Sequence, residues 1–384
     1  MQYNPSSNTK SLYIHWPFCP YRCNFCPFVA LASHDQFMER YHAALMKEIE
    51  TFAQQCDRKL ALDTIYIGGG TPSTWPDHLL LDTFGRLKSM FNIQDQTEVT
   101  IEVNPGTVRI EQFELWKQAG INRISTGVQS LKDEALHKLN RMQSAKDVYF
   151  LLEHASKVIH NISVDFILGL PGVSAQEWKT YLQEVVTWPI KHMSMYFLMV
   201  HEQTPLYFKV KTNAVRLPKD ETVVQLYYWS RELLDTHGFK QYEVSNFAQT
   251  GWESRHNTVY WDRKPYKAFG LGACSFDGTS RFQNEKNLMK YLEGASQGHD
   301  VTIFSEDLSI KQIRLERLML GLRRAQGVTW DTVISGLSEA EIAQVSQQIS
   351  MLQEKNLIVD IDGRLQLTPA GLIVENDIVA RLSL

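Results

Sequence analysis

Residues 11–26 read SLYIHWPFCPYRCNFC, a short apolar strand that runs directly into a loop with three cysteines. These cysteines, Cys19, Cys23 and Cys26, have the spacing C-x3-C-x2-C. Three thiolates this close together converge on one centre most easily from a loop, and the neighbouring prolines disfavour a helix there. A [4Fe–4S] cluster takes four ligands, so three cysteines leave one iron open to an exogenous ligand.

The same array also allows a closed zinc site. His15 lies in the predicted strand on the same face as Tyr13, and it could complete a Cys3His ligand set. The spacing alone does not name the metal. Iron–sulfur cluster and zinc are therefore both open on this evidence.

The cysteine loop begins a series of alternating strands and helices. Strands are predicted at 12–16, 64–68, 99–103, 123–128, 163–168 and 193–198, and helices at 34–55, 76–91, 110–118, 145–159 and 175–186. Alternation of this kind predicts a parallel sheet with the helices outside. Six repeats predict an α/β fold, a partial (β/α)6 TIM-like barrel, whose chemistry sits at the carboxyl ends of the strands.

The rest of the chain divides further. Residues 1–218 form the predicted barrel, and the less regular region 219–305 is expected to complete it. Residues 306–384 contain helices at 309–323 and 339–355, a hairpin signal at Asp362-Gly363 and a last helix, which predict a small winged-helix-like α+β domain. With 8 Lys+Arg against 11 Asp+Glu, this domain is expected to have a structural or interaction role rather than to bind DNA.

Composition narrows the class of protein. The 384 residues carry 39 Lys+Arg and 43 Asp+Glu, and this net charge of −4 gives no general attraction to nucleic acid. Five unevenly spaced cysteines do not form a secreted disulfide scaffold. The N-terminal MQYNPSSNTK lacks the apolar segment of a signal peptide, and no stretch approaches the roughly 18 apolar residues of a membrane span. A cytoplasmic protein is expected.

Polar and glycine residues lie in or at the ends of several of the predicted strands. They are Gly68-Gly69-Gly70-Thr71-Pro72, Glu102, Gln129, Asp165 and, in the sequence LNR, Arg141. Each alone is explained by an ordinary turn or by a hydrogen-bonded group in the core. Together, at the strand ends of one barrel, they predict one pocket, in which Arg141 pairs with a carboxylate.

The cysteine array in the first loop of a partial barrel resembles the radical S-adenosylmethionine (SAM) superfamily. In that family the open iron of a [4Fe–4S] cluster binds the amino and carboxylate groups of SAM, and one electron splits the sulfonium to give a 5′-deoxyadenosyl radical. The resemblance implies that Cys19, Cys23 and Cys26 hold the cluster. It implies a SAM pocket formed by Tyr13, Phe25, Gly69, Gly70, Thr71, Glu102, Gln129, Arg141, Asp165 and Met199, and it leaves a second SAM open.

The resemblance extends over essentially the whole chain. The stretches YIHWPFCPYRCNFC, GGGTPS, IEVNP, GVQS, DFILGLPG, YEVSNFA, ESRHNTVYW and FGLGA look like the anaerobic coproporphyrinogen III oxidase-like family. Within it, the oxygen-independent oxidase, which decarboxylates two propionates, competes with the heme chaperone HemW. Phe28 stands where the oxidase has a further cysteine, only 18 residues precede Cys19, and 256–261 read HNTVYW, matching the chaperone's H-N-x-x-Y-W.

The chaperone branch implies a heme site at His256, Tyr260 and Trp261. Neutral imidazole is a standard axial ligand of heme iron, and the two aromatic rings could pack on the macrocycle. The alternative is a His256 that only makes hydrogen bonds. Cys274 departs from the family's GAHS pattern, as either a thiolate ligand or a small buried core residue.

The implied function is to carry heme to acceptor hemoproteins, such as respiratory ones. Coproporphyrinogen oxidase activity is not expected, and the sequence leaves open whether radical chemistry operates. A homodimer and peripheral contact with a membrane also stay open.

Overall fold

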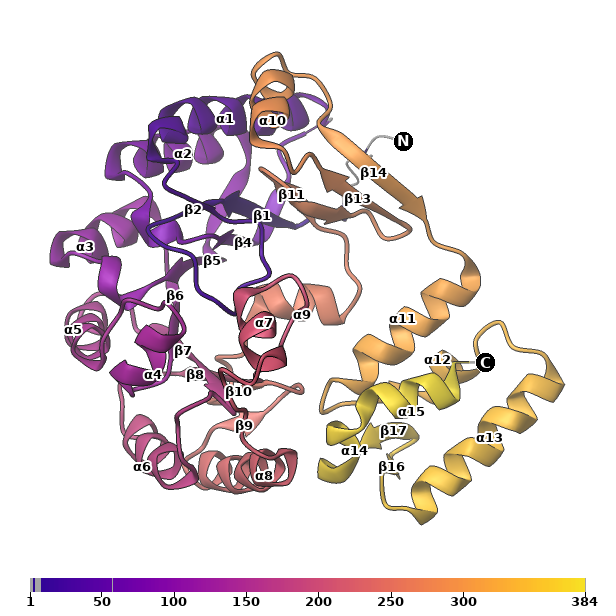
Figure 1. Ribbon diagram of the computed structural model, residues 1–384. Helices are drawn as coiled ribbons and strands as arrows, with labels where there is room; N and C mark the ends of the chain where they lie inside the picture. Colours follow the sequence, from indigo (N-terminus) through magenta and orange to yellow (C-terminus); the bar gives the residue numbers. More distant parts are fainter. Residues whose placement is uncertain (1–2, 4–7, 57, 384) are drawn as a thin grey trace.

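The computed structural model describes residues 3, 8–56 and 58–383, so that part of the N-terminal stretch MQYNPSSNTK lies outside the described residues. A nine-stranded sheet forms the centre of the molecule (Figure 1). Its six central strands run parallel to one another: β1 (Ser11–Trp16), β4 (Ala61–Gly69), β5 (Asn92–Val103), β6 (Arg123–Gln129), β7 (Asn161–Leu168) and β8 (His192–Phe197). These are the six predicted strands, and they confirm the α/β barrel-like fold.

Three short strands that the sequence pattern did not predict widen this sheet. β11 (Lys267–Phe269) pairs in parallel with β1 at one edge. At the other edge β10 (Asn246–Ala248) is antiparallel to β8, and β9 (Lys240–Gln241) is antiparallel to β10. All three come from the region between the six-strand repeat and the C-terminal domain.

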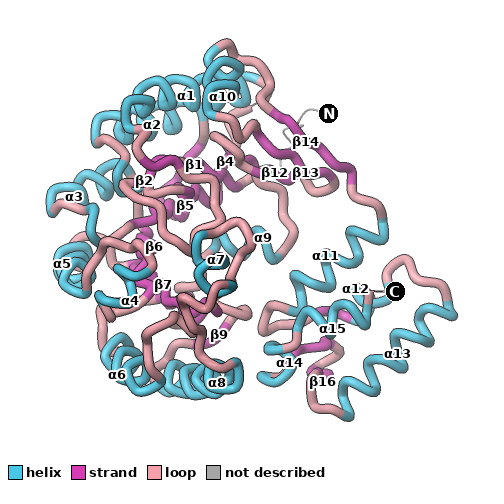
Figure 2. The backbone as a smooth tube through the Cα atoms, viewed as in Figure 1, coloured by secondary structure: helices cyan, strands magenta, loops and turns pink. Residues whose placement is uncertain are grey.

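Helices lie along the outer side of the sheet (Figure 2). They are α1 (Met38–Gln54), α2 (Asp77–Met90), α3 (Ile110–Ala119), α4 (Asp133–Lys138), α5 (Ala145–Ala155) and α6 (Ala175–Val185). The five predicted helices are confirmed: four are shorter than predicted, and α3 extends one residue further, to Ala119. The first begins at Met38 because residues Asp35–Phe37 form a 3₁₀ turn, and Pro76 precedes the second as its N-cap.

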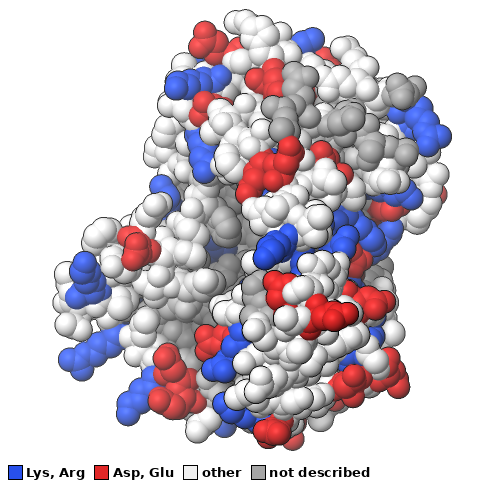
Figure 3. All heavy atoms as spheres, turned by 90° about the vertical axis from the view of Figure 1, so that its right-hand side faces the viewer, with Lys and Arg blue, Asp and Glu red and all other residues white. Residues whose placement is uncertain are grey.

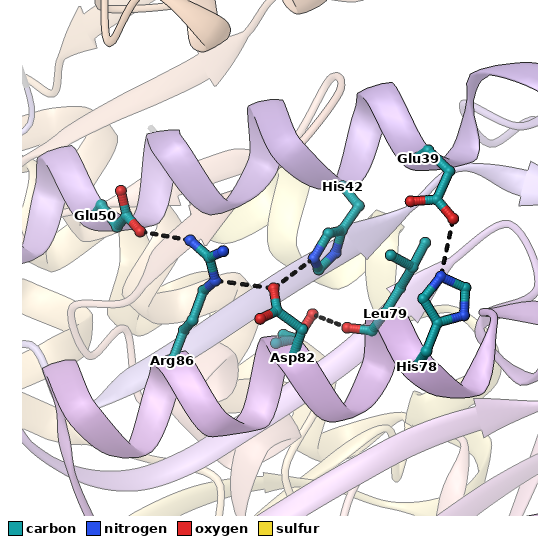
Figure 4. Close-up of polar contacts among 8 residues, drawn as sticks. Glu39, His42, Glu50, His78, Leu79, Asp82 and Arg86 are labelled. Carbon is teal, nitrogen blue, oxygen red and sulfur yellow. Dashed lines mark hydrogen bonds and ion pairs between the residues drawn. The ribbon is translucent and has the colours of Figure 1, made fainter.

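Charged side chains join the first two outer helices (Figure 4). On α2, Arg86 donates to Glu50 Oε1 of α1 at 2.8 Å and to Asp82 Oδ2 of its own helix at 2.8 Å. His42 of α1 contacts the same Asp82 oxygen at 2.9 Å. Exposed pairs of this kind typically contribute less than about 1 kcal/mol each. The apolar faces of the helices, packed on the sheet, provide most of the stability.

The region after β8 is more irregular. It contains α7 (Pro205–Lys211), α8 (Asp220–Thr236), α9 (Arg255–Trp261), β12 (Cys274–Phe276), β13 (Ser280–Asn284), α10 (Leu288–Ser296) and β14 (Thr302–Asp307). Strands β12, β13 and β14 form a separate antiparallel sheet. Near the cysteines, β2 (Phe18–Cys19) pairs in parallel with β3 (Leu31–Ala32).

The C-terminal segment has its own hydrophobic core, built from residues between Leu318 and Leu382. Its elements are α11 (Ile310–Leu322), β15 (Val328–Thr329), α12 (Trp330–Ile334), α13 (Glu339–Glu354), β16 (Ile358–Ile361), β17 (Arg364–Leu367), α14 (Pro369–Ile373) and α15 (Glu375–Leu382). Helices with a three-stranded antiparallel sheet confirm the predicted winged-helix-like fold. The predicted single last helix is two, because the helix breaks at Val374.

On the face of the molecule drawn in Figure 3, which includes the C-terminal domain, acidic and basic side chains are intermixed. No continuous basic surface, of the kind that follows a phosphate backbone, is visible on the face drawn. Among the described residues, no helix is both long and apolar enough to cross a membrane.

Candidate functional site

The three cysteines of the first loop are all free thiols. Thr71 Oγ1 donates a hydrogen bond to Cys19 Sγ at 3.3 Å, and Arg141 Nη1 lies 3.7 Å from Cys23 Sγ. Burial raises the pKa of Cys19 to about 11, although the Thr71 hydrogen bond opposes this. A metal cluster would favour the thiolates that burial disfavours. Three thiols on one loop, with two donors beside them, fit the ligand set of a [4Fe–4S] cluster.

The glycine turn after β4 packs directly against the cysteine loop. Gly70 N donates to Trp16 O at 2.7 Å and Thr71 N donates to Phe18 O at 2.9 Å. A Cβ on Gly70 would lie only 2.5 Å from Pro17 O, and Gly69 has a φ of +121°. Only glycine permits this close approach and this conformation. The turn therefore holds the cysteine loop on the carboxyl end of β4.

Glu102, near the end of β5, faces the same turn. Its carboxylate accepts hydrogen bonds from Gly69 N at 3.0 Å and from the Tyr66 hydroxyl at 2.9 Å. Burial raises the pKa of Glu102 to about 7, against the effect of these two donors. Tyr13 stacks on Tyr66, with ring centroids 6.1 Å apart. A cationic amino group at this position would stabilise the ionised carboxylate.

Residues of β6 and of the segment after α4 meet beside the cysteines. Arg141 Nη2 donates to Gly127 O at 2.8 Å. A Cβ on Gly127 would lie 2.7 Å from the side-chain nitrogen Nε2 of Gln129. Gln129 has a φ of +64°, which non-glycine residues rarely adopt outside functional or strained sites. The prediction that Arg141 pairs with a carboxylate is wrong: in the described structure its partners are Gly127, Gln143 and Cys23.

Asp165 is a buried carboxyl group on β7. Ser125 Oγ and Ser163 Oγ donate to it at 3.2 Å and 3.4 Å, and burial raises its pKa. Its charge contributes to the raised pKa of Glu102. The structure thus places Glu102 on β5 and Asp165 on β7, two strands separated by β6, in one barrel interior.

The two remaining residues of the predicted SAM pocket are apolar and lie on other segments. Phe25 packs in a small apolar cluster that includes Leu139 and Leu206. Met199, on the segment after β8, is 67% exposed. Phe25 is thus partly buried among apolar side chains, whereas Met199 is open to solvent.

His15 does not take the role that the zinc alternative requires. Its Nδ1 lies 3.0 Å from the Tyr13 hydroxyl and its Nε2 lies 3.0 Å from Val29 O, so both ring nitrogens are engaged. Among the described residues, no three His, Cys, Asp or Glu side chains gather as they would around a single metal ion. To act as the fourth ligand of zinc, His15 would have to give up one of these two hydrogen bonds.

The HNTVYW motif forms helix α9, which the structure packs against the sheet. His256 is fully buried, with Nδ1 2.7 Å from Thr64 Oγ1 and Nε2 2.8 Å from the Tyr260 hydroxyl. Its ring stacks on Tyr66 with centroids 5.1 Å apart. Burial lowers the pKa of His256 to about 3, and the charge of Arg123 adds to this. The imidazole is therefore neutral, the form that ligates iron.

The other members of this predicted site lie differently. Trp261, at the end of α9, lines a cavity that faces the C-terminal domain. Cys274 is exposed and accepts a hydrogen bond from Gln283 Nε2 at 3.2 Å. The expectation of a buried core cysteine is wrong. Cys274 is the first residue of β12, and its side chain is exposed while those of the next two residues are buried.

Sequence reasoning missed several polar residues of the barrel interior. Tyr66 links His256 to Glu102, as described above, and Thr64 lies two residues earlier on the same strand face. His192 has almost the same surroundings as His256: Nδ1 lies 2.7 Å from Ser163 Oγ and Nε2 lies 2.7 Å from the Tyr242 hydroxyl. Period-two alternation along the predicted strands was the signal that could have identified these residues.

Comparison with known proteins gives one consistent result. Residues 13–185 match the Radical SAM superfamily, and residues 308–374 match the HemN C-terminal domain. The chain is 32% identical over 373 residues to the heme chaperone HemW of Bacillus subtilis, covering 96% of this chain and 98% of that protein. It is 30% identical over 391 residues to the bovine mitochondrial radical S-adenosyl methionine domain-containing protein 1, covering 98% and 88%.

Among solved structures, coproporphyrinogen III oxidase (HemN) from Escherichia coli superimposes with a TM-score of 0.82. The match covers 98% of this chain and 91% of that one, at 21% sequence identity. At this identity the likeness establishes a shared fold.

Proposed function

Because the chain belongs to the family of the heme chaperone HemW, we propose that it binds heme and transfers it to acceptor hemoproteins, with respiratory hemoproteins as the expected class. The observation that carries this proposal is the near full-length match to HemW proteins. Helix α9 supports the proposal, because it carries His256, whose buried imidazole is neutral and therefore in the form that ligates iron.

Membership of the radical SAM superfamily implies a [4Fe–4S] cluster and SAM. We assign the cluster to Cys19, Cys23 and Cys26, and bound there it would supply one-electron chemistry and an open iron for SAM. Gly69, Gly70 and Thr71 would form the floor beside it, because a Cβ on either glycine would collide with His15 or with the backbone of Pro17 and push the turn away from the cysteine loop. Glu102, with its raised pKa, is the expected partner of the SAM amino group.

Heme ligation by His256 requires the buried imidazole to become accessible and one of its hydrogen bonds to open. Thr64 fixes Nδ1, while Nε2 is held by Tyr260, which lies one helical turn later on the same helix. Rotation of the Tyr260 side chain would free Nε2 for iron and leave Nδ1 held. A second partner of this kind orients most metal-binding histidines.

The test is an anaerobic titration of the cluster-reconstituted protein with ferric heme, followed in the Soret region. We expect stoichiometric binding whose spectrum changes in His256→Ala. His192→Ala is the matched control, because it removes a buried histidine with the same kind of partners. Identical spectra for His256→Ala and the wild type would refute ligation by His256, and no binding by the wild type would refute the carrier function.

The alternative is oxygen-independent coproporphyrinogen III oxidase, which shares the fold. It predicts loss of propionate carboxyl groups from coproporphyrinogen, coupled to SAM cleavage. An assay for decarboxylated product, run beside the titration, separates the two functions. Product formation without heme binding would favour the oxidase.

A further inference from the structure

A cavity of about 280 Å³ lies where the barrel region meets the C-terminal domain. Helices α9 and α11 are side by side here (Figure 1). The wall combines Trp261 at the end of α9, Gly278 in the turn between β12 and β13, and residues of α11, β15 and β17. The cavity is therefore assembled from segments far apart in the chain.

Positive charge dominates the wall. Four arginines line the cavity, Arg263, Arg317, Arg324 and Arg364, with Asp262 as its only acidic residue among those described. Asp262 is already paired with Arg324 and lies 2.9 Å from Lys264 Nζ. Burial lowers the pKa of Arg324, and repulsion from Arg364 adds to this. The wall has more cationic groups than it can neutralise by itself.

Several donors of this wall have no partner. Arg263 donates Nε to Glu316 at 2.6 Å, but its Nη2 is buried without an acceptor, and its side chain is 8% exposed. The indole Nε1 of Trp261 is likewise buried without an acceptor. Arg317 is exposed, and in the described structure it makes neither a hydrogen bond nor an ion pair. Buried unpartnered donors are uncommon in folded proteins, so those of Arg263 and Trp261 are available to an acceptor that enters the cavity.

We propose that this cavity binds the propionate carboxylates of heme, with an edge of the macrocycle against Trp261. The inference rests on the proposed heme-carrier function. Arginine is well suited to carboxylates because its planar guanidinium donates two parallel hydrogen bonds. The volume lies at the lower limit of small-molecule sites, so the cavity takes one edge of the porphyrin and leaves the rest outside.

Propionate binding here is separate from iron ligation by His256. Trp261 follows His256 by five residues. In a helix this spacing separates two side chains by about 7.5 Å along the axis and by more than a third of a turn around it. His256 points into the barrel, whereas Trp261 lines the cavity. An iron-free porphyrin should therefore bind at the cavity as well as heme does.

The experiment measures the binding of protoporphyrin IX and of its dimethyl ester, by porphyrin fluorescence anisotropy, to the full-length protein. Protoporphyrin IX has both propionates and no iron, and the ester lacks only the negative charges. Arg317→Gln is the test variant, because Arg317 has no protein partner to lose. Arg40→Gln, which changes an exposed arginine of α1 outside the cavity, is the matched control.

We expect Arg317→Gln to weaken protoporphyrin IX binding about 5-fold and Arg317→Glu more than about 10-fold, the range for one exposed charge-assisted contact. Neither variant should change binding of the ester, which should already be weak in the wild type. Arg40→Gln should bind both porphyrins as the wild type does. Succinate at matched ionic strength should not displace the porphyrin.

Equal affinity of the wild type for diacid and ester would overturn the proposal, as would unchanged diacid binding by the Arg317 variants. Displacement by succinate would overturn the porphyrin assignment in favour of a general carboxylate site. If heme binding depends on His256 but not on Arg317, the proposed carrier function is supported and the proposed propionate site is refuted. If protoporphyrin IX binds in a manner that depends on Arg317 but ferric heme does not bind, the proposed carrier function is refuted and the proposed carboxylate site is supported.

Discussion

Replacing Gly70 by alanine tests whether the glycine turn holds the cysteine loop. The added Cβ would lie 2.5 Å from Pro17 O and 2.7 Å from Phe18 O, both backbone atoms that cannot rotate away. The loop or the turn must shift, and overpacking of this kind costs about 1–3 kcal/mol of unfolding free energy. The same shift would displace Cys19, so we also expect less iron per chain after reconstitution.

Gly85→Ala is the matched control for this substitution. Gly85 lies inside α2, and a Cβ there would meet nothing within 4 Å. Alanine at an exposed helix-interior position should stabilise the fold by about 0.5–1 kcal/mol. The stabilities of the two alanine variants should therefore lie on opposite sides of the wild type and differ from each other by about 1.5–4 kcal/mol. The measurement is urea unfolding of the cluster-free protein under anaerobic conditions. The reasoning fails if Gly70→Ala is as stable as Gly85→Ala or retains full iron content.

Three further substitutions test other parts of the structure. The pKa of His256 is about 3 in the folded state and near 6.5 when unfolded, so protons bind the unfolded chain first as pH falls. Wild-type stability should drop between pH 6.5 and 4, and His256→Gln should lose up to about 3 kcal/mol less over that window, measured by urea unfolding at each pH. Arg314→Met removes a buried guanidinium that donates to Leu382 O at 2.8 Å, and should lower the unfolding free energy by about 2–3 kcal/mol and speed amide exchange in α15. Thr71→Val removes the donor to Cys19 and should lower iron retention while changing the melting temperature little; equal retention would show that this hydrogen bond has no role.

The sequence was sufficient to predict the barrel because its strands and helices have clear periods. Each of the six central strands is a short apolar run next to an amphipathic helix, and that alternation leaves few topologies. The same logic predicted that Glu102 and Asp165 would share one interior, since both lie on parallel strands of the same sheet, with only β6 between them. The cysteine loop was predictable because its spacing is local.

The elements that were missed depend on contacts made after the barrel exists. Strands β10 and β11 have three residues each, too few to show a period, and they are strands because they add to the edges of a finished sheet. Helix α8 carries a run of aromatic residues, Tyr227-Tyr228-Trp229, on more than one face, which obscures its amphipathic pattern. The predicted pairing of Arg141 with a carboxylate was wrong for a related reason. Its observed partners include a backbone carbonyl and a thiol, and such partners cannot be inferred from residue types.

The HNTVYW motif shows most clearly where local sequence stops being informative. Six consecutive residues suggested one ligand surface, yet the helix divides them between two environments. His256 is engaged by Thr64, 192 residues earlier in the chain, and Trp261 lines a cavity completed by the C-terminal domain. Neither partner can be inferred from the motif, because burial and charge around α9 are set by segments distant in sequence. The two proposals therefore assign different tasks to the two ends of the motif. Iron ligation by His256 would require Tyr260 to move, whereas the arginines beside Trp261 would donate hydrogen bonds to carboxylates without any change in the barrel.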